Sequence, residues 1–197
     1  MKKIGFDLDN TIIDYSTTVS NFCSIKGIPY QDSINSLRQL LKKSDGDQRF
    51  WIEAQSWIYG PGIESARLAN NFVKLCRKLI ELDCEIKVFS HKTEFGPEEF
   101  GSQPFQKFAN TWLQNSDANQ YLSVNRDILY FNTLGEKVAG IVQYSPNYYV
   151  DDLLKVFAHP SYNREINSYI YGNSPEEHDW LVSVNDFEQL ETYILCR

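Results

Sequence analysis

The chain has 197 residues and a net charge of −7, with 42% hydrophobic and 23% charged residues. This length suits one α/β domain with an insertion, or two small units, and allows a sizeable core. The acidic balance argues against a nucleic-acid polymer or an anionic membrane surface as the main partner. We find no stretch typical of a signal peptide or membrane span, and the four cysteines lack metal-binding spacing. We therefore expect a cytoplasmic protein with reduced thiols.

The chain opens with a short apolar strand that is followed by two carboxylates. Lys3–Phe6 is the predicted strand, Asp7 and Asp9 come directly after it, and Thr11 follows. Asn10 and Thr11 favour a turn, so we expect the carboxylates at the carboxyl end of the strand, where open α/β sheets bind ligands. Two carboxylates this close repel each other unless a cation or a proton lies between them. The pattern indicates a cation site, or simply a strand end with solvated carboxylates.

A helical region without a strand signal follows, from about residue 15 to residue 59. Apolar positions at helical spacing predict three helices there, and we interpret the region as an insertion over the carboxyl edge of the sheet. The predicted domains are an α/β core of residues 1–14 and 60–197 and a helical cap of residues 15–59. Trp51, Trp57 and Tyr59 in the cap could stack on a base or sugar, although such residues more often form a core.

Helices and strands alternate in the rest of the chain. The predicted elements are a helix at about 64–82, a strand at 85–89, a helix from Pro104, a strand at 127–131, a helix at 134–143, a strand at 148–150, a helix at 153–157, a strand at 168–171 and a final helix capped by Asp186. This alternation predicts an α/β fold with a Rossmann-like parallel sheet of about five strands, flanked by helices and carrying a small all-helical cap.

Polar side chains also follow two later strands of the predicted sheet. Ser90 ends the second strand, Asp151 and Asp152 end the fourth, and Lys137 lies on the helix before the fourth strand. Each has an ordinary structural explanation when it is taken alone. Ser90 fits a strand-end turn, Lys137 an exposed helix lysine, and the acidic pair the N-cap of the next helix.

Taken together in chain order, these residues resemble the four motifs of the haloacid dehalogenase (HAD) superfamily, whose members are mostly Mg-dependent phosphatases. Asp7-x-Asp9-x-Thr11 is similar to motif I, Ser90 to motif II, Lys137 to motif III and Asp151-Asp152 to motif IV. The resemblance spans residues 4–152, and its order and spacing are more specific than any one motif.

The resemblance implies roles for these residues. Asp7 would be the nucleophile, Asp9 the general acid and base, and Lys137 the cation that offsets crowded negative charge. The implied cofactor is Mg²⁺, held by Asp7, by Asp9 through its backbone carbonyl, and by the acidic pair. Alignment with motif IV makes Asp152 the ligand and Asp151 the residue that orients a ligand water, but the two could exchange roles.

The implied substrate contacts follow the same pattern. Thr11 and Ser90 would hydrogen-bond phosphoryl oxygens. His91 and Lys92 directly follow Ser90, so either could reach a substrate anion, although surface residues in a turn would look the same.

The implied function is hydrolysis of a small phosphorylated metabolite, a sugar phosphate or a nucleotide monophosphate, through an aspartyl-phosphate. The retained Asp9 favours a phosphatase over a dehalogenase. Two alternatives stay open: a phosphomutase, which uses the same acid, and a non-catalytic module that binds a phosphorylated ligand. The sequence does not indicate an oligomeric state.

Overall fold

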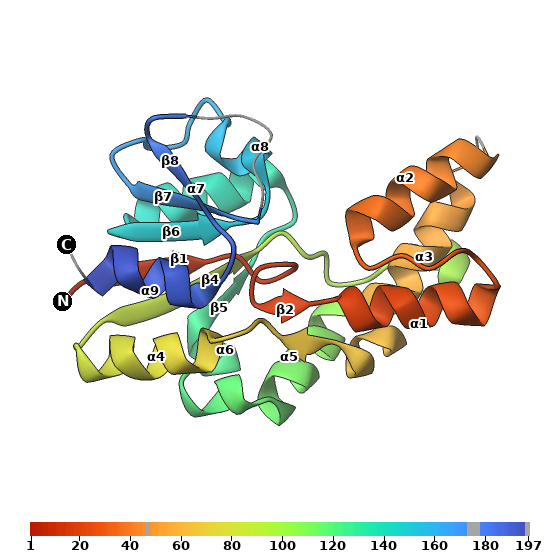
Figure 1. Cartoon of the computed structure of the whole chain (residues 1–197), viewed down its shortest axis with the longest axis horizontal. Coiled ribbons are helices and arrows are strands. Elements are labelled where there is room, and N and C mark those ends of the chain that lie inside the picture. Colours follow the sequence, from red (N-terminus) through yellow and green to blue (C-terminus); the bar gives the residue numbers. More distant parts are fainter. Residues whose placement is uncertain (46–47, 173–177, 196–197) are drawn as a thin grey trace.

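The structure, a computed structural model, describes residues 1–45, 48–172 and 178–195. Within these residues its centre is a six-stranded parallel sheet with the strand order β5-β4-β1-β6-β7-β8 (Figure 1). The strands are β1 Lys3–Phe6, β4 Glu85–Ser90, β5 Ile128–Tyr130, β6 Tyr148–Asp151, β7 Asn167–Tyr171 and β8 Leu181–Val184. The α/β class and the parallel sheet are confirmed, with one strand, β8, more than the sequence predicts.

β1 lies in the middle of the sheet and is covered on both faces. Ile4 and Phe6 are fully buried on one face, and Gly5 faces the rings of Phe89 and Tyr149 on the other. A central parallel strand of this kind consists of apolar residues almost throughout, because neither face meets water. The hydrophobic character of this strand therefore reflects its central position.

The register of the strands brings their polar ends to one edge. Phe6 pairs with Val88 of β4 and with Val150 of β6. Asp7 and Asp151 each come one residue after this row, and Ser90 comes two residues after it in β4. The chain moves to opposite sides of β1 in β4 and β6, so these residues lie at the topological switch point of the sheet.

Helices cover both faces of the sheet (Figure 1). On one face, α4 (Phe72–Glu81) packs against α9 (Phe187–Leu195), with the rings of Phe72 and Phe187 5.0 Å apart. On the other face, α7 (Leu134–Tyr144) and α8 (Leu154–Phe157) enclose a second apolar cluster around Phe89 and Tyr149. The remaining short elements are α5 Phe105–Asn115, α6 Val124–Asp127, and the 3₁₀ helices η1 Pro61–Ser65, η2 Glu98–Phe100 and η3 Asp117–Gln120.

Several predicted boundaries shift by one residue or more, and two of these shifts have a clear structural cause. The helix predicted from residue 64 begins at Phe72, because β3 (Arg67–Leu68) pairs in antiparallel fashion with β2 (Ile13–Asp14). The strand predicted at 127–131 begins one residue later, because Asp127 ends α6 and its carboxylate accepts a hydrogen bond from Ser123 N. In both places a contact of this kind, and not the local apolar pattern, determines where the element begins.

The described residues between 15 and 59 form three helices and no strand. These are α1 Ser16–Lys26, α2 Ile34–Asp45 and α3 Arg49–Tyr59, which lie together to one side of the sheet (Figure 1). The chain enters this helical region through β2 and returns towards the sheet through β3. Val19, Phe22 and Ala54 are buried in a core that continues into the sheet cluster containing Phe6. The division into a core and a cap stays a prediction.

Cys23, Cys76 and Cys84 are buried free thiols, and Cys196 lies outside the described residues. Among the helices described, none is long and apolar enough to cross a membrane.

Candidate active site

The chain turns sharply after β1 and places Asp7 and Asp9 in different settings. Asp7 N still donates to Val150 O at 2.8 Å, which extends the pairing of β1 with β6. Leu8 O then accepts hydrogen bonds from the next turn of backbone, and Asn10 adopts a left-handed conformation with φ of 61°. Asparagine tolerates this conformation better than most residues. Asp9 therefore lies in a turn rather than in the strand.

Lys137 joins two of the carboxylates at the sheet edge. Its Nζ lies 2.5 Å from Asp7 Oδ1 and 2.6 Å from Asp151 Oδ2, and its side chain is 1% exposed. Lys137 lies in the first turn of α7, and the N-cap residue Thr133 forms a capping box with Glu136. This capping box fixes where α7 starts, and the position of that start directs Lys137 towards the strand ends.

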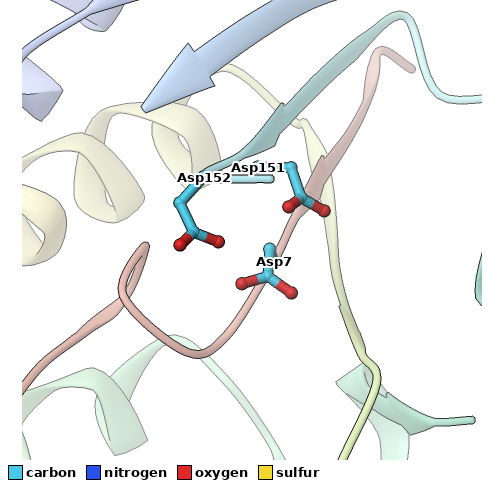
Figure 2. Close-up of side chains that lie close together, drawn as sticks. All are labelled: Asp7, Asp151 and Asp152. Atoms are coloured by element: carbon cyan, nitrogen blue, oxygen red, sulfur yellow. The ribbon is translucent and has the colours of Figure 1, made fainter. Parts of the chain in front are cut away.

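The two members of the acidic pair have different partners. Asp151 is fully buried and accepts hydrogen bonds from Lys137 Nζ, from Tyr149 OH at 2.8 Å and from Leu153 N at 2.9 Å. Asp152 has no side-chain hydrogen bond or ion pair to any described residue. Its carboxylate faces those of Asp7 and Asp151 (Figure 2), and ligand atoms of the three lie within 4.8 Å of one another.

Three carboxylates, those of Asp7, Asp151 and Asp152, share the single positive charge of Lys137. Burial raises the pKa of Asp7 to about 7, an effect that Lys137 opposes and that Asp151 and Asp9 reinforce. Burial, together with Asp7 and Asp151, also raises the pKa of Asp152 well above its usual value. Closely spaced carboxylates with raised pKa values form a set of oxygen donors that suits a hard divalent cation.

Asp9 belongs to a second group of contacts. Asp9 Oδ1 accepts a hydrogen bond from Tyr15 OH at 2.7 Å, and Lys92 Nζ lies 3.0 Å from the same oxygen. The side chain of Lys92 is 3% exposed, and its ammonium lies 4.1 Å from the ring centroid of Tyr59. Lys92 is therefore a buried residue paired with Asp9, and the alternative of a surface residue in a turn is wrong for it.

The other predicted substrate contacts fall into two kinds. Thr11 and Ser90 are buried, and neither hydroxyl has a hydrogen-bond partner among the described residues. A buried hydroxyl without a partner is costly, so each has a donor available for a ligand. His91 is exposed, lines the cleft described below, and has Nε2 3.0 Å from Asn132 O.

A cleft of about 600 Å³ lies between the strand ends and the helical region. Its lining includes Asp7, Asp9, Lys92, Lys137 and Asp152 from the strand ends and Asn35, Arg38, Gln48, Trp51, Gln55 and Tyr59 from the helical region. Trp57 instead packs against Phe22, with the ring centroids 5.7 Å apart. Of the three aromatic residues proposed for stacking, Trp51 and Tyr59 therefore lie beside the cleft, whereas Trp57 is half-buried against the hydrophobic core and does not line this cleft.

Two residues of the site were not predicted from the sequence. Tyr149 precedes Asp151 by two residues in β6, so the period of a strand places both on one face and could have found it. Tyr15 has no comparable signal, because its contact with Asp9 depends on the turn that the chain makes between β1 and β2. Six of the predicted residues meet at one edge in the two groups described above: Asp7, Asp151, Asp152 and Lys137 in the first group, and Asp9 and Lys92 in the second.

No family model and no curated protein matches the sequence. Solved structures with the same fold are nevertheless found. A predicted phosphatase from Clostridium acetobutylicum superposes with a TM-score of 0.63 at 14% identity, covering 100% of this chain and 99% of the other. A haloacid dehalogenase-like family hydrolase from Streptococcus pneumoniae has a TM-score of 0.61 at 13% identity, with 98% of both chains covered.

A third structure is YfnB from Bacillus subtilis, solved with magnesium bound. It has a TM-score of 0.60 at 11% identity, covering 100% of this chain and 99% of the other. At these identities the likeness establishes the arrangement of the chain and not its chemistry. The protein therefore has the fold of the HAD-superfamily hydrolases.

Proposed function

We propose that the protein is a Mg²⁺-dependent phosphatase that hydrolyses a small phosphorylated metabolite through an aspartyl-phosphate on Asp7. The observation that carries this proposal is the convergence of Asp7, Asp151 and Asp152 within 4.8 Å beside the buried ammonium of Lys137. The HAD fold supports it, as do the predicted phosphatase and the magnesium-bound neighbour among the similar structures.

Asp7 and Asp152 are the side chains that would hold the metal, together with the backbone carbonyl of Asp9. The Asp151 carboxylate accepts three hydrogen bonds, whereas the Asp152 carboxylate accepts none from the described residues. This difference favours Asp152 as the direct ligand and Asp151 as the residue that orients the site. When bound, Mg²⁺ supplies positive charge that lets a dianionic phosphate approach the carboxylates.

In the first half of the reaction, a carboxylate oxygen of Asp7 attacks phosphorus and the bond from phosphorus to the leaving oxygen breaks. Asp9 gives its proton to that oxygen, so the leaving group departs as an alcohol. Lys137 stays charged beside Asp7 and offsets the added negative charge. The unpartnered hydroxyls of Thr11 and Ser90 donate to the phosphoryl oxygens.

In the second half, Asp9 is a carboxylate and accepts a proton from water while the water oxygen attacks phosphorus. The bond between phosphorus and Asp7 breaks, which releases inorganic phosphate and restores the Asp7 carboxylate. One water is consumed for each ester hydrolysed, and Asp9 ends the cycle protonated as it began.

Residues 15–59 serve as the cap in this proposal, and the cleft beneath them receives the leaving group. Asn35, Gln48 and Gln55 offer side-chain amides, and Arg38 lies over the ring of Trp51 at 5.6 Å. A wall of amides and one guanidinium suits a polar leaving group, which makes a sugar phosphate or a nucleotide monophosphate the proposed substrate.

The test is phosphate release from a panel of sugar phosphates and nucleotide monophosphates, with Mg²⁺ and with a chelator. Asp7→Asn should abolish release, whereas Asp83→Asn, the same change at an exposed site, should leave it intact. Release that persists in chelator, or in the Asp7→Asn variant, would contradict the proposal. A requirement for a sugar bisphosphate without net phosphate release would instead identify a phosphomutase.

A further inference from the structure

The hydroxyl of Tyr15 is placed to act on Asp9 and on no substrate. Tyr15 is 2% exposed, and its OH donates to Asp9 Oδ1 at 2.7 Å. It is not among the residues that line the cleft, whereas Asp9 is. Any influence of this hydroxyl on the reaction must therefore pass through Asp9.

The second group on the same oxygen is the ammonium of Lys92, 3.0 Å from Asp9 Oδ1. Its other near neighbour is the ring of Tyr59, at 4.1 Å, which stabilises a buried cation through its π-face. Both contacts meet Oδ1, and Oδ2 has no hydrogen bond or ion pair to any residue that the structure describes. The two oxygens of Asp9 are therefore unequal.

We infer that Tyr15 is a positioning residue for Asp9: with Lys92 it holds Oδ1, so that Oδ2 is the oxygen that gives and takes the proton. The inference rests on the proposed function, in which Asp9 is the acid and base. The ion pair with Asp9 gives Lys92 this role in addition to its place in the lining of the cleft.

The position of Tyr15 in the chain links this arrangement to the cap. Tyr15 comes directly after β2 and precedes α1, and Tyr59 is the last residue of α3. Their rings meet edge to face, with centroids 5.3 Å apart. The two ends of the helical region thus meet beside Lys92 and Asp9, and the acid is oriented by residues from both ends.

The test compares two esters that differ in their need for an acid. A p-nitrophenolate leaves without a proton, whereas the alkoxide of an alkyl phosphate needs one. The ratio kcat/KM reports events up to formation of the phosphorylated Asp7, and so isolates the acid step. Tyr15→Phe should lower kcat/KM about ten- to hundredfold for an alkyl phosphate, which is less than the roughly 10²- to 10⁴-fold that a general acid contributes, because Asp9 itself is still present. The loss for p-nitrophenyl phosphate should be less than about threefold.

Two further variants separate positioning from a structural effect. In an Asp9→Asn background, Tyr15→Phe should cause no further loss with the alkyl phosphate, because the group that it positions is gone. Tyr162→Phe removes another buried hydroxyl, which lies 2.8 Å from Ser168 Oγ, and should leave both ratios unchanged.

Three results would overturn the inference while leaving the proposed function intact. These are an equal loss by Tyr15→Phe on both esters, no loss on either, and a full further loss in the Asp9→Asn background. A wild-type protein that hydrolyses neither ester and no member of the sugar phosphate and nucleotide monophosphate panel would overturn the proposed function itself, and this inference with it.

Discussion

Lys137 Nζ lies 2.6 Å from Asp151 Oδ2, and both side chains are at most 1% exposed. The same ammonium contacts Asp7. Burial alone would lower the pKa of Lys137, but Asp151 and Asp7 raise it above its usual value, so the group stays charged. One buried cation therefore holds Asp7 and Asp151 in a fixed relation, which makes it the first target for mutation.

Lys137→Met should destabilise the protein and abolish activity. Removing one partner of a buried ion pair costs about 3–5 kcal/mol, because the remaining charges are uncompensated. The free energy of unfolding, measured in urea with chelator present, should fall by that amount. The control is Lys74→Met, which breaks an exposed contact with Glu188 and should cost less than about 1 kcal/mol. Equal losses in the two variants would contradict the role of Lys137.

Mg²⁺ should raise the thermal unfolding midpoint. A ligand at about a hundredfold excess over its Kd adds about 2.7 kcal/mol to the stability of the folded state. For a chain of this size, this corresponds to a rise of about 5–10 °C. Asp152→Asn should remove most of the rise, whereas Asp83→Asn should keep it. A thermal shift titration with Mg²⁺ makes the comparison, and an undiminished rise in the Asp152→Asn variant would exclude Asp152 as a ligand.

The metal-free protein should lose stability as the pH rises from about 4 to about 7. Burial raises the pKa of Asp7 from 3.8 to about 7, so the folded state binds more protons than the unfolded state in this window. Stability therefore falls with rising pH, by at most about 1.4 kcal/mol per pH unit for this group, and levels off above the folded pKa.

Urea unfolding in chelator at several pH values measures this dependence. Asp7→Asn cannot titrate at this position, so its stability should fall less than that of the wild type across the same window. The Asp83→Asn variant should follow the wild type. An equal or steeper fall in Asp7→Asn would show that Asp7 is not the titrating group.

Gly5→Ala should disturb the site by moving Tyr149, which contacts Asp151. A Cβ at Gly5 would lie 2.7 Å from Tyr149 Cδ2 and 3.2 Å from Phe89 Cε2, so the Tyr149 ring must move. Its hydroxyl donates to Asp151, and the shift should therefore lower activity as well as stability, the latter by about 1–3 kcal/mol. Gly135→Ala in α7 is the control, since its nearest atom is 3.9 Å away. Urea unfolding and kcat of both variants test this, and an unperturbed Gly5→Ala protein would contradict it.

The residues that could be predicted from the sequence are those whose position follows from a strand end. Asp7, Ser90 and Asp151 come at or directly after the ends of parallel strands, so their meeting at one edge follows from the α/β alternation. Lys137 was placed with them only by the resemblance to motif III, because helical periodicity alone also fits an exposed lysine. Local periodicity was therefore enough for the three strand-end residues and not for Lys137.

The parts that could not be predicted depend on contacts distant in sequence. β3 lies in a stretch with helical apolar spacing, and its pairing with Ile13–Asp14 is visible only once the chain is folded. β8 is a four-residue strand with a serine within it, too short to show a clear period. The burial of Lys92 depends on Tyr15 and Tyr59, which approach it from the two ends of the helical region.

The antiparallel pairing of β2 with β3 affects how the sequence of this protein can evolve. The chain leaves the sheet and returns to it at two adjacent points, so the intervening segment closes on itself. Lengthening a closed loop costs little, about 0.6 kcal/mol for each doubling. Insertions, deletions and sequence drift in this segment therefore leave the spacing of Asp7, Lys137 and Asp151 unchanged. On our proposal, substrate preference is free to diverge there while the chemistry is inherited, except at Tyr15 and Tyr59.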